Sequence, residues 1–478
     1  VNLLLVSAPH SFGWPWGKGN FYRGFYEYLG TGYLAAACER EGVSVEILDA
    51  PFHGWGPKQT ADEIRKRDFD VLGISANWQQ FFPQTAELLN LLRDLNKPIL
   101  LGGHFPTIAH REILADFPHL TAVGIGEAES SLSEAVRVLA RNGALEDVLG
   151  MAVRGSATVC DAGTETSGPR GVGAGRDLIV NTGTKPLCVD LDGLPFPLRP
   201  QADIYRAAKN PGLAAASLLS SRGCGGHCSF CTIHAFQRVS PGPRWRTRSP
   251  ENVVAEIEML QKDYGFTHFR FVDEDFFGRC PEGRRRAEEI ARLIISKGIK
   301  MNFELYCRAD EVDPDILSLL KEAGLDGMYL SLDAATDEDI ELYSKGTTRE
   351  QMVNSVKYVY DSGVKLAYSF IFWHPYRRLR DITKAFSILD EASEGDPKVY
   401  ASMLKGLETG IISDLVVLTG SPLEEKIRRD GLLKGNYRQY TYGFTHTSTR
   451  LAYFFVRGYK KMRSVAENLS NTKQRPKL

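Results

Sequence analysis

The sequence predicts an α/β fold of two units, a doubly wound parallel sheet followed by a partial barrel of six strand–helix repeats. Short β-branched runs alternate with helical segments over residues 1–141, which is typical of a parallel sheet with helices on both faces. A second alternating series begins near residue 213 and contains six expected strands, fewer than the eight of a complete barrel. The length of 478 residues also favours two or three domains over one.

In the first unit, each expected strand is a short apolar run. These runs are residues 3–8, 44–50, 70–75 and 98–103. The expected helices between and after them cover residues 31–42, 61–67, 85–95, 107–116 and 130–141. Ligands of such sheets bind beyond the carboxyl ends of the strands.

Residues 142–205 are expected to form a partly irregular connector, because a Gly/Ser/Thr-rich run is followed by a proline-rich one. The barrel is expected over residues 206–435. Its expected strands are residues 213–222, 267–275, 300–310, 326–334, 365–373 and 414–420. A short helical tail over residues 436–478 is expected to pack an aromatic face on the barrel and to end in a basic segment.

The composition argues against several classes of protein. Lys and Arg number 58 against 59 Asp and Glu, a formal charge of -1, which gives no electrostatic basis for a nucleic-acid partner. No apolar run approaches the roughly 18 residues that span a membrane. The first residues lack the basic region and cleavage site of a secretory signal. Eight cysteines are too few for a disulfide scaffold of this length, so a cytoplasmic protein is expected.

Three of the cysteines lie in one glycine-rich loop that follows the first strand of the barrel. Cys224, Cys228 and Cys231 have the spacing C-x3-C-x2-C. Three thiolates can bind one face of a four-iron cluster and leave the fourth iron open, whereas a ferredoxin uses four cysteines. A zinc site with His227 or His234 as the fourth ligand is the alternative. The other five cysteines are scattered and are expected to be ordinary thiols.

The loop resembles the motif of the radical S-adenosylmethionine (SAM) superfamily, in which an aromatic residue, here Phe230, precedes the last cysteine. The resemblance implies a TIM-type partial barrel whose three cysteines hold a [4Fe–4S] cluster with SAM on the open iron. Reductive cleavage of SAM would give methionine and a 5′-deoxyadenosyl radical that abstracts a substrate hydrogen. The electron donor would be a flavodoxin, a ferredoxin or a dehydrogenase partner.

The same resemblance assigns SAM-binding candidates to the ends of later strands. The acidic run after the second strand is similar to the family's contact with the SAM amino group, and Arg308 suits the SAM carboxylate. The fourth strand is similar to a segment that reaches the ribose and methionine portions, although an aspartate stands there in place of the more usual glutamate. The remaining candidates are Asp273, Glu274, Asp275, Ser331 and Asp333.

Two further groups of barrel residues are candidates for contact with substrate. Alternation along the third strand places Glu304 and Tyr306 on the face of Arg308, where they could relay protons. An Arg–Glu pair that fills the barrel is the alternative. At the end of the fifth strand, Trp373 and His374 replace the small residues usual in the family. They either shape the substrate pocket or pack within the barrel.

The first unit resembles the Rossmann-like cobalamin-binding domain that precedes many barrels of this superfamily. The matching residues are Ser75, Gly102, Gly103, His104, Gly126 and Glu127. The D-x-H-x-x-G motif that supplies a histidine to cobalt is absent. Bulky Trp78, Phe81 and Phe82 follow the third strand, and these rings could fill the slot that the cobalamin tail needs.

Three functions are therefore considered. In the first, a radical on an unactivated carbon of a small, natural-product type of substrate receives a methyl group from methylcobalamin. In the second, cobalamin is not used, the first unit is a scaffold, and the radical of a sugar or aminocyclitol loses water, epimerises or rearranges. In the third, the protein is a non-catalytic iron–sulfur or zinc sensor. A small-molecule substrate is favoured because no peptide- or tRNA-recognition module is recognisable.

Overall fold

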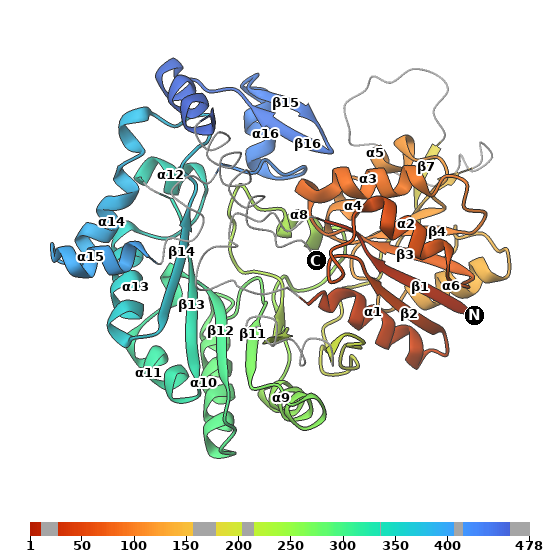
Figure 1. Cartoon of the computed structure of the whole chain (residues 1–478), viewed down its shortest axis with the longest axis horizontal. Coiled ribbons are helices and arrows are strands. Elements are labelled where there is room, and N and C mark those ends of the chain that lie inside the picture. Colours follow the sequence, from red (N-terminus) through yellow and green to blue (C-terminus); the bar gives the residue numbers. More distant parts are fainter. Residues whose placement is uncertain (11–26, 156–177, 203–214, 335, 406–413, 459–478) are drawn as a thin grey trace, which may run out of the picture.

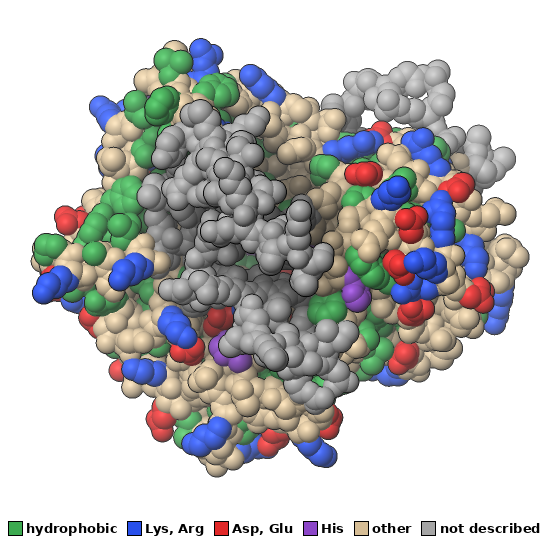
Figure 2. Space-filling model, in the orientation of Figure 1, with side chains coloured by type: hydrophobic (Ala, Val, Ile, Leu, Met, Phe, Trp, Pro, Cys, Tyr) green, Lys and Arg blue, Asp and Glu red, His purple; other side chains and the backbone are tan. Residues whose placement is uncertain are grey.

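The structure is a computed structural model that describes residues 1–10, 27–155, 178–202, 215–334, 336–405 and 414–458. Two α/β units lie side by side, and a C-terminal hairpin lies near the boundary between them (Figure 1). Charged side chains of both signs are interspersed over the face in Figure 2, in keeping with the balanced composition. In the part of the chain that is described, no helix is long and apolar enough to cross a membrane.

The first unit is built on a seven-stranded sheet with the order β2-β1-β3-β4-β5-β6-β7. The first five strands are parallel, as expected, and β6 and β7 are antiparallel additions at one edge. The strands are β1 (Asn2–Ser7), β2 (Ser44–Asp49), β3 (Val71–Ser75), β4 (Ile99–Gly102), β5 (Ala122–Gly124), β6 (Met151–Gly155) and β7 (Leu178–Asn181). The helices are α1 (Leu29–Arg40), α2 (Pro57–Arg65), α3 (Phe82–Leu91), α4 (His104–Ile108), α5 (His110–Asp116) and α6 (Leu132–Ala140).

The two antiparallel strands lie in the segment expected to be connector, residues 142–205. Each has only four or five residues, too short for alternation to distinguish a strand from a loop. Strand β6 forms because the edge of β5 offers unpaired backbone groups. The first sheet therefore extends beyond residue 141.

Alternation along β1 explains why helices cover both faces of this sheet. Leu3 and Leu5 pack with residues of α1 and α6, whereas Leu4 and Val6 pack with residues of α2, α3 and α5 on the other face. All four side chains are at most 3% exposed. Successive strand residues point to opposite faces, so a run of consecutive apolar residues serves both cores.

The second unit contains a five-stranded parallel sheet with the order β14-β13-β12-β11-β8. The strands are β8 (Ala215–Leu218), β11 (His268–Phe271), β12 (Asn302–Arg308), β13 (Leu325–Asp333) and β14 (Lys365–Phe370). The principal helices are α9 (Pro250–Tyr264), α10 (Pro281–Ser296), α11 (Pro314–Glu322), α13 (Arg349–Ser362), α14 (Lys384–Ala392) and α16 (Pro422–Arg429). The expected sixth strand, residues 414–420, makes only an isolated bridge between Asp414 and Trp373 in the described part of the chain.

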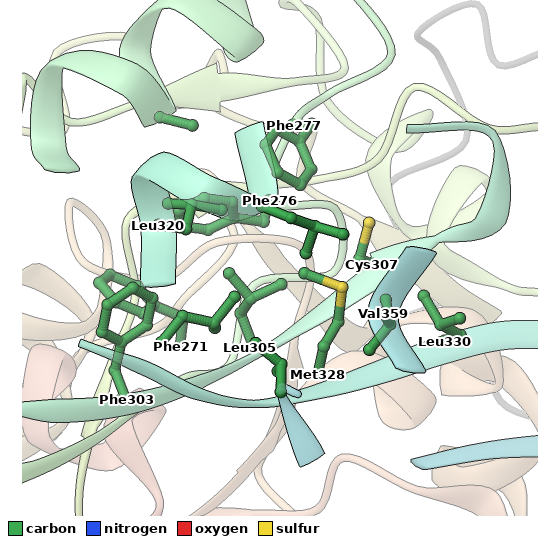
Figure 3. Close-up of a cluster of buried hydrophobic side chains, with 14 of the residues drawn as sticks. Phe271, Phe276, Phe277, Phe303, Leu305, Cys307, Leu320, Met328, Leu330 and Val359 are labelled. Atoms are coloured by element: carbon green, nitrogen blue, oxygen red, sulfur yellow. The ribbon is translucent and has the colours of Figure 1, made fainter. Parts of the chain in front are cut away.

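The barrel core lies between this sheet and its helices. Phe271, Phe303, Leu305 and Met328 from neighbouring strands lie together in Figure 3, with Leu320 of α11 beside them. Each is at most 2% exposed. Since burying such a side chain contributes about 1.5–3 kcal/mol, this cluster fixes the strands whose carboxyl ends carry the candidate site.

The C-terminal part begins with the hairpin of β15 (Leu433–Asn436) and β16 (Gln439–Tyr442) and continues as a helix over residues 447–458. The ring of Tyr453 on this helix lies 5.3 Å from that of Trp373 and 4.9 Å from that of Phe444. Tyr453 of the expected aromatic face therefore packs on the barrel, whereas Phe454 and Phe455 are 64% and 79% exposed. The expected basic end begins at residue 459 and lies outside the described residues.

A buried charge network joins the connector to both units. Arg199 pairs with Glu27 of the first unit and donates to Glu256 of α9 at 2.7 Å. Glu256 is fully buried and also accepts from Arg248. Such a network fixes the position of the connector because each buried charge needs its partner.

We expect Glu256→Gln to lower the free energy of unfolding by about 3–5 kcal/mol, because two buried guanidinium groups would lose a charged partner. The measurement is urea unfolding followed by circular dichroism. Glu258→Gln is the matched control on the same helix. Its ion pair with Lys297 is almost half exposed, so a loss under about 1 kcal/mol is expected. Equal losses in the two variants would contradict the assignment.

Candidate functional site

The cysteine loop occupies the turn between β9 (Ser221–Arg222) and α8 (Ile233–Gln237). Gly223 has a φ of +90°, and a Cβ there would clash with the Arg244 carbonyl oxygen and the Gln237 side chain. A Cβ at Gly225 would approach the Gly278 carbonyl oxygen to 2.6 Å. Glycine is therefore required at the entrance to the loop.

The environment of the three thiols fits an iron–sulfur cluster. The backbone N–H of Gly226 donates to Cys224 Sγ at 3.2 Å, and Arg308 Nη1 lies 3.6 Å from Cys228 Sγ. Burial raises the pKa of Cys231 to about 11, and the neighbouring Cys228 adds to this shift. Burial also raises the pKa of Cys224, as do Asp275 and Cys231. Donors to sulfur tune such clusters, and a bound metal overcomes the raised pKa by deprotonating the thiol.

The two histidines considered as a fourth ligand to zinc lie next to each other. His227 and His234 stack with ring centroids 5.0 Å apart. Within the described ranges, however, no group of three or more His, Cys, Asp or Glu side chains converges closely enough for one metal ion. Zinc needs its sulfur ligands at about 2.3 Å. A multi-iron cluster distributes its thiolates over separate irons, so the sulfurs need not converge on a single point.

The structure separates the three acidic candidates that follow β11. Asp273 is buried and accepts from Ser220 and Ser221, with oxygen–oxygen distances of 2.9 Å and 2.5 Å. Asp275 is also buried and accepts from the backbone N–H groups of Gly225 and Gly278. Those two carboxylates therefore accept hydrogen bonds from the backbone around the cysteine loop, at Ser220, Gly225 and Gly278.

Glu274, between them, is the acid that reaches open space. Its side chain is exposed to a cavity and accepts from the backbone N–H of Gly223 at 3.3 Å. Of the three, Glu274 is therefore placed to bind a ligand.

On the barrel side, the SAM-binding candidates form a connected polar network. Arg308 donates to Asp310 at 3.0 Å and to the Lys345 carbonyl oxygen at 2.6 Å. The ammonium group of Lys345 lies 2.5 Å from Asp333, and Ser331 donates to the same carboxylate oxygen at 3.0 Å. Lys345 is 1% exposed. No sequence motif marked Lys345, because its burial follows from how the turn after α12 (Asp337–Leu342) folds back.

The two candidates for proton transfer face neighbouring side chains of the barrel. Glu304 forms a buried ion pair with Arg270 on the adjacent strand. The ring of Tyr306 lies 5.4 Å from that of Tyr329. The Glu304 contact corresponds to the alternative interpretation, an Arg–Glu pair within the barrel.

The residues at the end of the fifth barrel strand also pack inside the protein. Trp373 and His374 are each 3% exposed. His374 Nε2 lies 3.0 Å from Asp339, which also pairs with Arg377 at 2.7 Å. Phe230 contacts Tyr343 in this region, with ring centroids 5.4 Å apart. Packing therefore accounts for the bulky residues at this strand end.

A cavity of about 640 Å³ lies between the two units. All six residues expected to contact cobalamin line it, and the barrel contributes residues of the cysteine loop and Glu274. The six are Ser75, Gly102, Gly103, His104, Gly126 and Glu127. A Cβ added to Gly102 would meet no atom of the described residues within 4 Å, so this wall of backbone faces space that suits a ligand approaching the sheet.

The three rings after β3 do not act together. Phe82 is fully buried in the core of the first unit. Phe81 stacks on His10 with ring centroids 4.9 Å apart. Trp78, 39% exposed, lines the cavity. Of the three rings considered as able to fill the cofactor slot, Trp78 is therefore the one that lines the cavity.

Two of the expected cobalamin contacts also bind the barrel. His104 Nε2 lies 2.9 Å from Thr232 Oγ1, and its ring stacks on Phe236 with centroids 4.8 Å apart. Glu127 accepts two hydrogen bonds from Arg246, at 2.7 Å and 2.9 Å. These contacts join the two units beside the cysteine loop.

Comparison with known proteins agrees with this division of the chain. Residues 218–387 match the radical SAM superfamily, and residues 22–136 match the B12 binding domain. An uncharacterized methyltransferase of Pyrococcus horikoshii is 26% identical over 352 residues, and cytidylyl-2-hydroxyethylphosphonate methyltransferase of Streptomyces wedmorensis is 26% identical over 381 residues. Each alignment covers 73% of this chain and 69% of the relative.

A solved structure supports the fold over most of the chain. It is that of the cobalamin-dependent SAM radical enzyme OxsB with aqua-cobalamin and SAM bound, with a TM-score of 0.69 and 19% sequence identity. The match covers 94% of this chain but 65% of that structure. The likeness therefore concerns the arrangement of the two units.

We expect Cys224→Ala to lose the cluster, because two thiolates cannot retain it. The iron content should fall from about four irons per chain to well below one. Iron analysis and the absorbance of anaerobically reconstituted protein measure this. Cys188→Ala is the control, since Cys188 is partly exposed in the connector and should leave the iron content unchanged. Full iron content in Cys224→Ala would reject the site.

Proposed function

The chain carries a radical SAM domain preceded by a B12-binding domain, and from this we propose that it methylates an unactivated carbon of a small molecule by a cobalamin-dependent radical reaction. The single observation that carries the proposal is the shared cavity, which is lined by Gly102 of the first unit and by Cys231 of the cysteine loop. Radical methylation requires a methyl carrier and the reacting carbon in one enclosed space.

The radical SAM domain implies a [4Fe–4S] cluster and SAM, and the B12-binding domain makes cobalamin a candidate third cofactor. When bound, these groups would supply one-electron cleavage of SAM and a methyl carrier. Cys224, Cys228 and Cys231 would hold the cluster. The glycine backbone at Gly102 would admit the cobalamin tail, since that wall of the cavity is open.

Glu274 supports SAM binding at this cavity. Its carboxylate is exposed to the cavity beside the cysteine loop, where an ammonium group would form a charge-assisted hydrogen bond with it. Arg308 is held by Asp310 and lies beside Cys228. We assign Arg308 to fixing that cysteine's surroundings and Glu274 to the amino group of SAM.

A second candidate function uses the same radical without cobalamin. Trp78 favours it, because its ring reaches the cavity and takes up space there. In this case the substrate radical would eliminate water, epimerise or rearrange, and the first unit would be a scaffold. The substrate would again be a small molecule, and in both cases a low-potential protein such as a flavodoxin or ferredoxin would deliver the electron.

We expect protein prepared without oxygen, from cells given cobalamin, to contain cobalt and iron and to form 5′-deoxyadenosine from SAM and a strong reductant. Gly102→Val should lose cobalt and keep iron, because its side chain would enter the open part of the cavity. Gly56→Val is the control, since a Cβ there also meets nothing within 4 Å and Gly56 does not line the cavity.

The metal contents separate the two functions. Methyl transfer is supported if the unmodified protein contains stoichiometric cobalt, and if Gly102→Val loses that cobalt while Gly56→Val keeps it. Iron without cobalt in the unmodified protein would reject the cobalamin-dependent reaction and favour the second candidate. Absence of 5′-deoxyadenosine under reducing conditions would reject both.

We expect Glu274→Gln to raise the dissociation constant of SAM by about tenfold or more, since a hydrogen bond to a charged group contributes about 1.5–3 kcal/mol. Equilibrium binding of SAM to the reconstituted protein measures this. Glu288→Gln, on the surface of α10, is the control. Unchanged affinity in Glu274→Gln would remove Glu274 from the SAM site.

A further inference from the structure

Residues of the first unit contact both ends of the cysteine loop. At the C-terminal end, Thr232 directly follows Cys231, and its hydroxyl lies 2.9 Å from His104 Nε2. The ring of His104 also stacks on Phe236 at an interplanar angle of 14°. Helices α4 and α8, which carry His104 and Phe236, pack against each other at the boundary between the units (Figure 1).

At the N-terminal end of the cysteine loop, the contacts are ion pairs. Arg222, two residues before Cys224, pairs with Glu129 at 2.7 Å. Its strand β9 pairs with β10 (Arg246–Thr247), and Arg246 is bound by Glu127. The turn that carries both glutamates thus holds β9, from which the loop departs, and its paired strand β10. We call three contacts together the interdomain clamp: His104–Thr232, Glu129–Arg222 and Glu127–Arg246.

The His104 contact of the clamp and the open wall at Gly102 lie on one short segment of backbone. Gly103 has a φ of +115°, and a Cβ there would lie 2.7 Å from the Ala76 carbonyl oxygen. His104 follows Gly103 directly, and Gly102 precedes it. A molecule that binds against Gly102 therefore presses on the same short segment that holds Thr232, which leaves little freedom for either contact to move alone.

We propose that His104 is a positioning residue through which cavity occupancy and cluster assembly favour each other, so that cobalamin and the [4Fe–4S] cluster bind cooperatively. The inference rests on the cobalamin binding of the proposed function. A bound cluster would hold the cysteine loop in the position in which Thr232 contacts His104. Through His104, the cluster would also order the backbone at Gly102, against which cobalamin binds. By thermodynamic reciprocity, bound cobalamin then favours the cluster by the same factor.

The chemistry of His104 suits this role. Burial lowers the pKa of His104 to about 4, so the ring is neutral near pH 7 and carries no charge toward the loop. A neutral imidazole can donate to the Thr232 hydroxyl or accept from it. The contact therefore does not require a charge on the imidazole.

The test is a titration of hydroxocobalamin into the full chain, with and without the cluster, followed by absorbance. We expect about tenfold tighter binding to the cluster-loaded form, within the usual range of coupling between sites. His104→Ala and Thr232→Val should each reduce this ratio to near one, and the double variant should reduce it no further. His104→Gln, which retains a hydrogen-bonding group, should keep part of the ratio.

Arg438→Ala is the matched control. Arg438 joins the hairpin to Asp116 of the first unit at 2.6 Å, so its loss also removes a contact between the units but leaves the cysteine loop untouched. This variant should keep the tenfold ratio. Equal affinity in the two forms of the unmodified protein, or an unchanged ratio in His104→Ala, would overturn the proposal. Loss of the ratio in Arg438→Ala would overturn it as well, since general docking would then explain the coupling.

A second measurement separates this inference from the proposed function. If neither form binds cobalamin, the cobalamin-dependent function and the cooperativity both fail. The positioning role of His104 is then decided by the electron paramagnetic resonance spectrum of the reduced cluster. His104→Ala should shift its g-values, and Arg438→Ala should not. Identical spectra for the two variants and the unmodified protein would reject the positioning role.

Discussion

Three successive acidic side chains after β11 give the cysteine loop its shape. Asp273 binds Ser220 and Ser221, Glu274 binds the Gly223 N–H, and Asp275 binds the Gly225 N–H. The loop and the residues just before it are therefore held at three points, in chain order, by the segment that follows β11. Glycines have no side chain, which makes this close approach of two backbone segments sterically feasible. The cysteines lie between and after these anchored glycines.

This anchoring has an energetic cost. Burial raises the pKa of Asp273, which means that desolvation disfavours the charged form of that carboxyl group. The hydroxyl groups of Ser220 and Ser221, together with the charge of Arg286, offset the cost. Burial also raises the pKa of Glu274, which both binds the Gly223 N–H and lines the cavity.

The cavity belongs to neither unit alone. Its walls come from the strand ends of the first sheet and from the cysteine loop of the second, and the clamp holds these walls together through buried charges and a neutral histidine. Breaking one buried ion pair leaves an uncompensated charge. The relative position of the two units is thus part of the site itself, since residues of both line the cavity.

The sequence alone determined the order of the two α/β units and the cysteine loop, because apolar periodicity and the C-x3-C-x2-C spacing are local patterns. It also indicated six of the first-unit residues that line the cavity, since carboxyl ends of parallel strands meet at one edge. Only the tertiary structure decided which acid faces the cavity, that Trp78 alone among three rings reaches it, and that Lys345 is buried beside Asp333. Those outcomes depend on contacts between residues far apart in the chain, which no local pattern encodes.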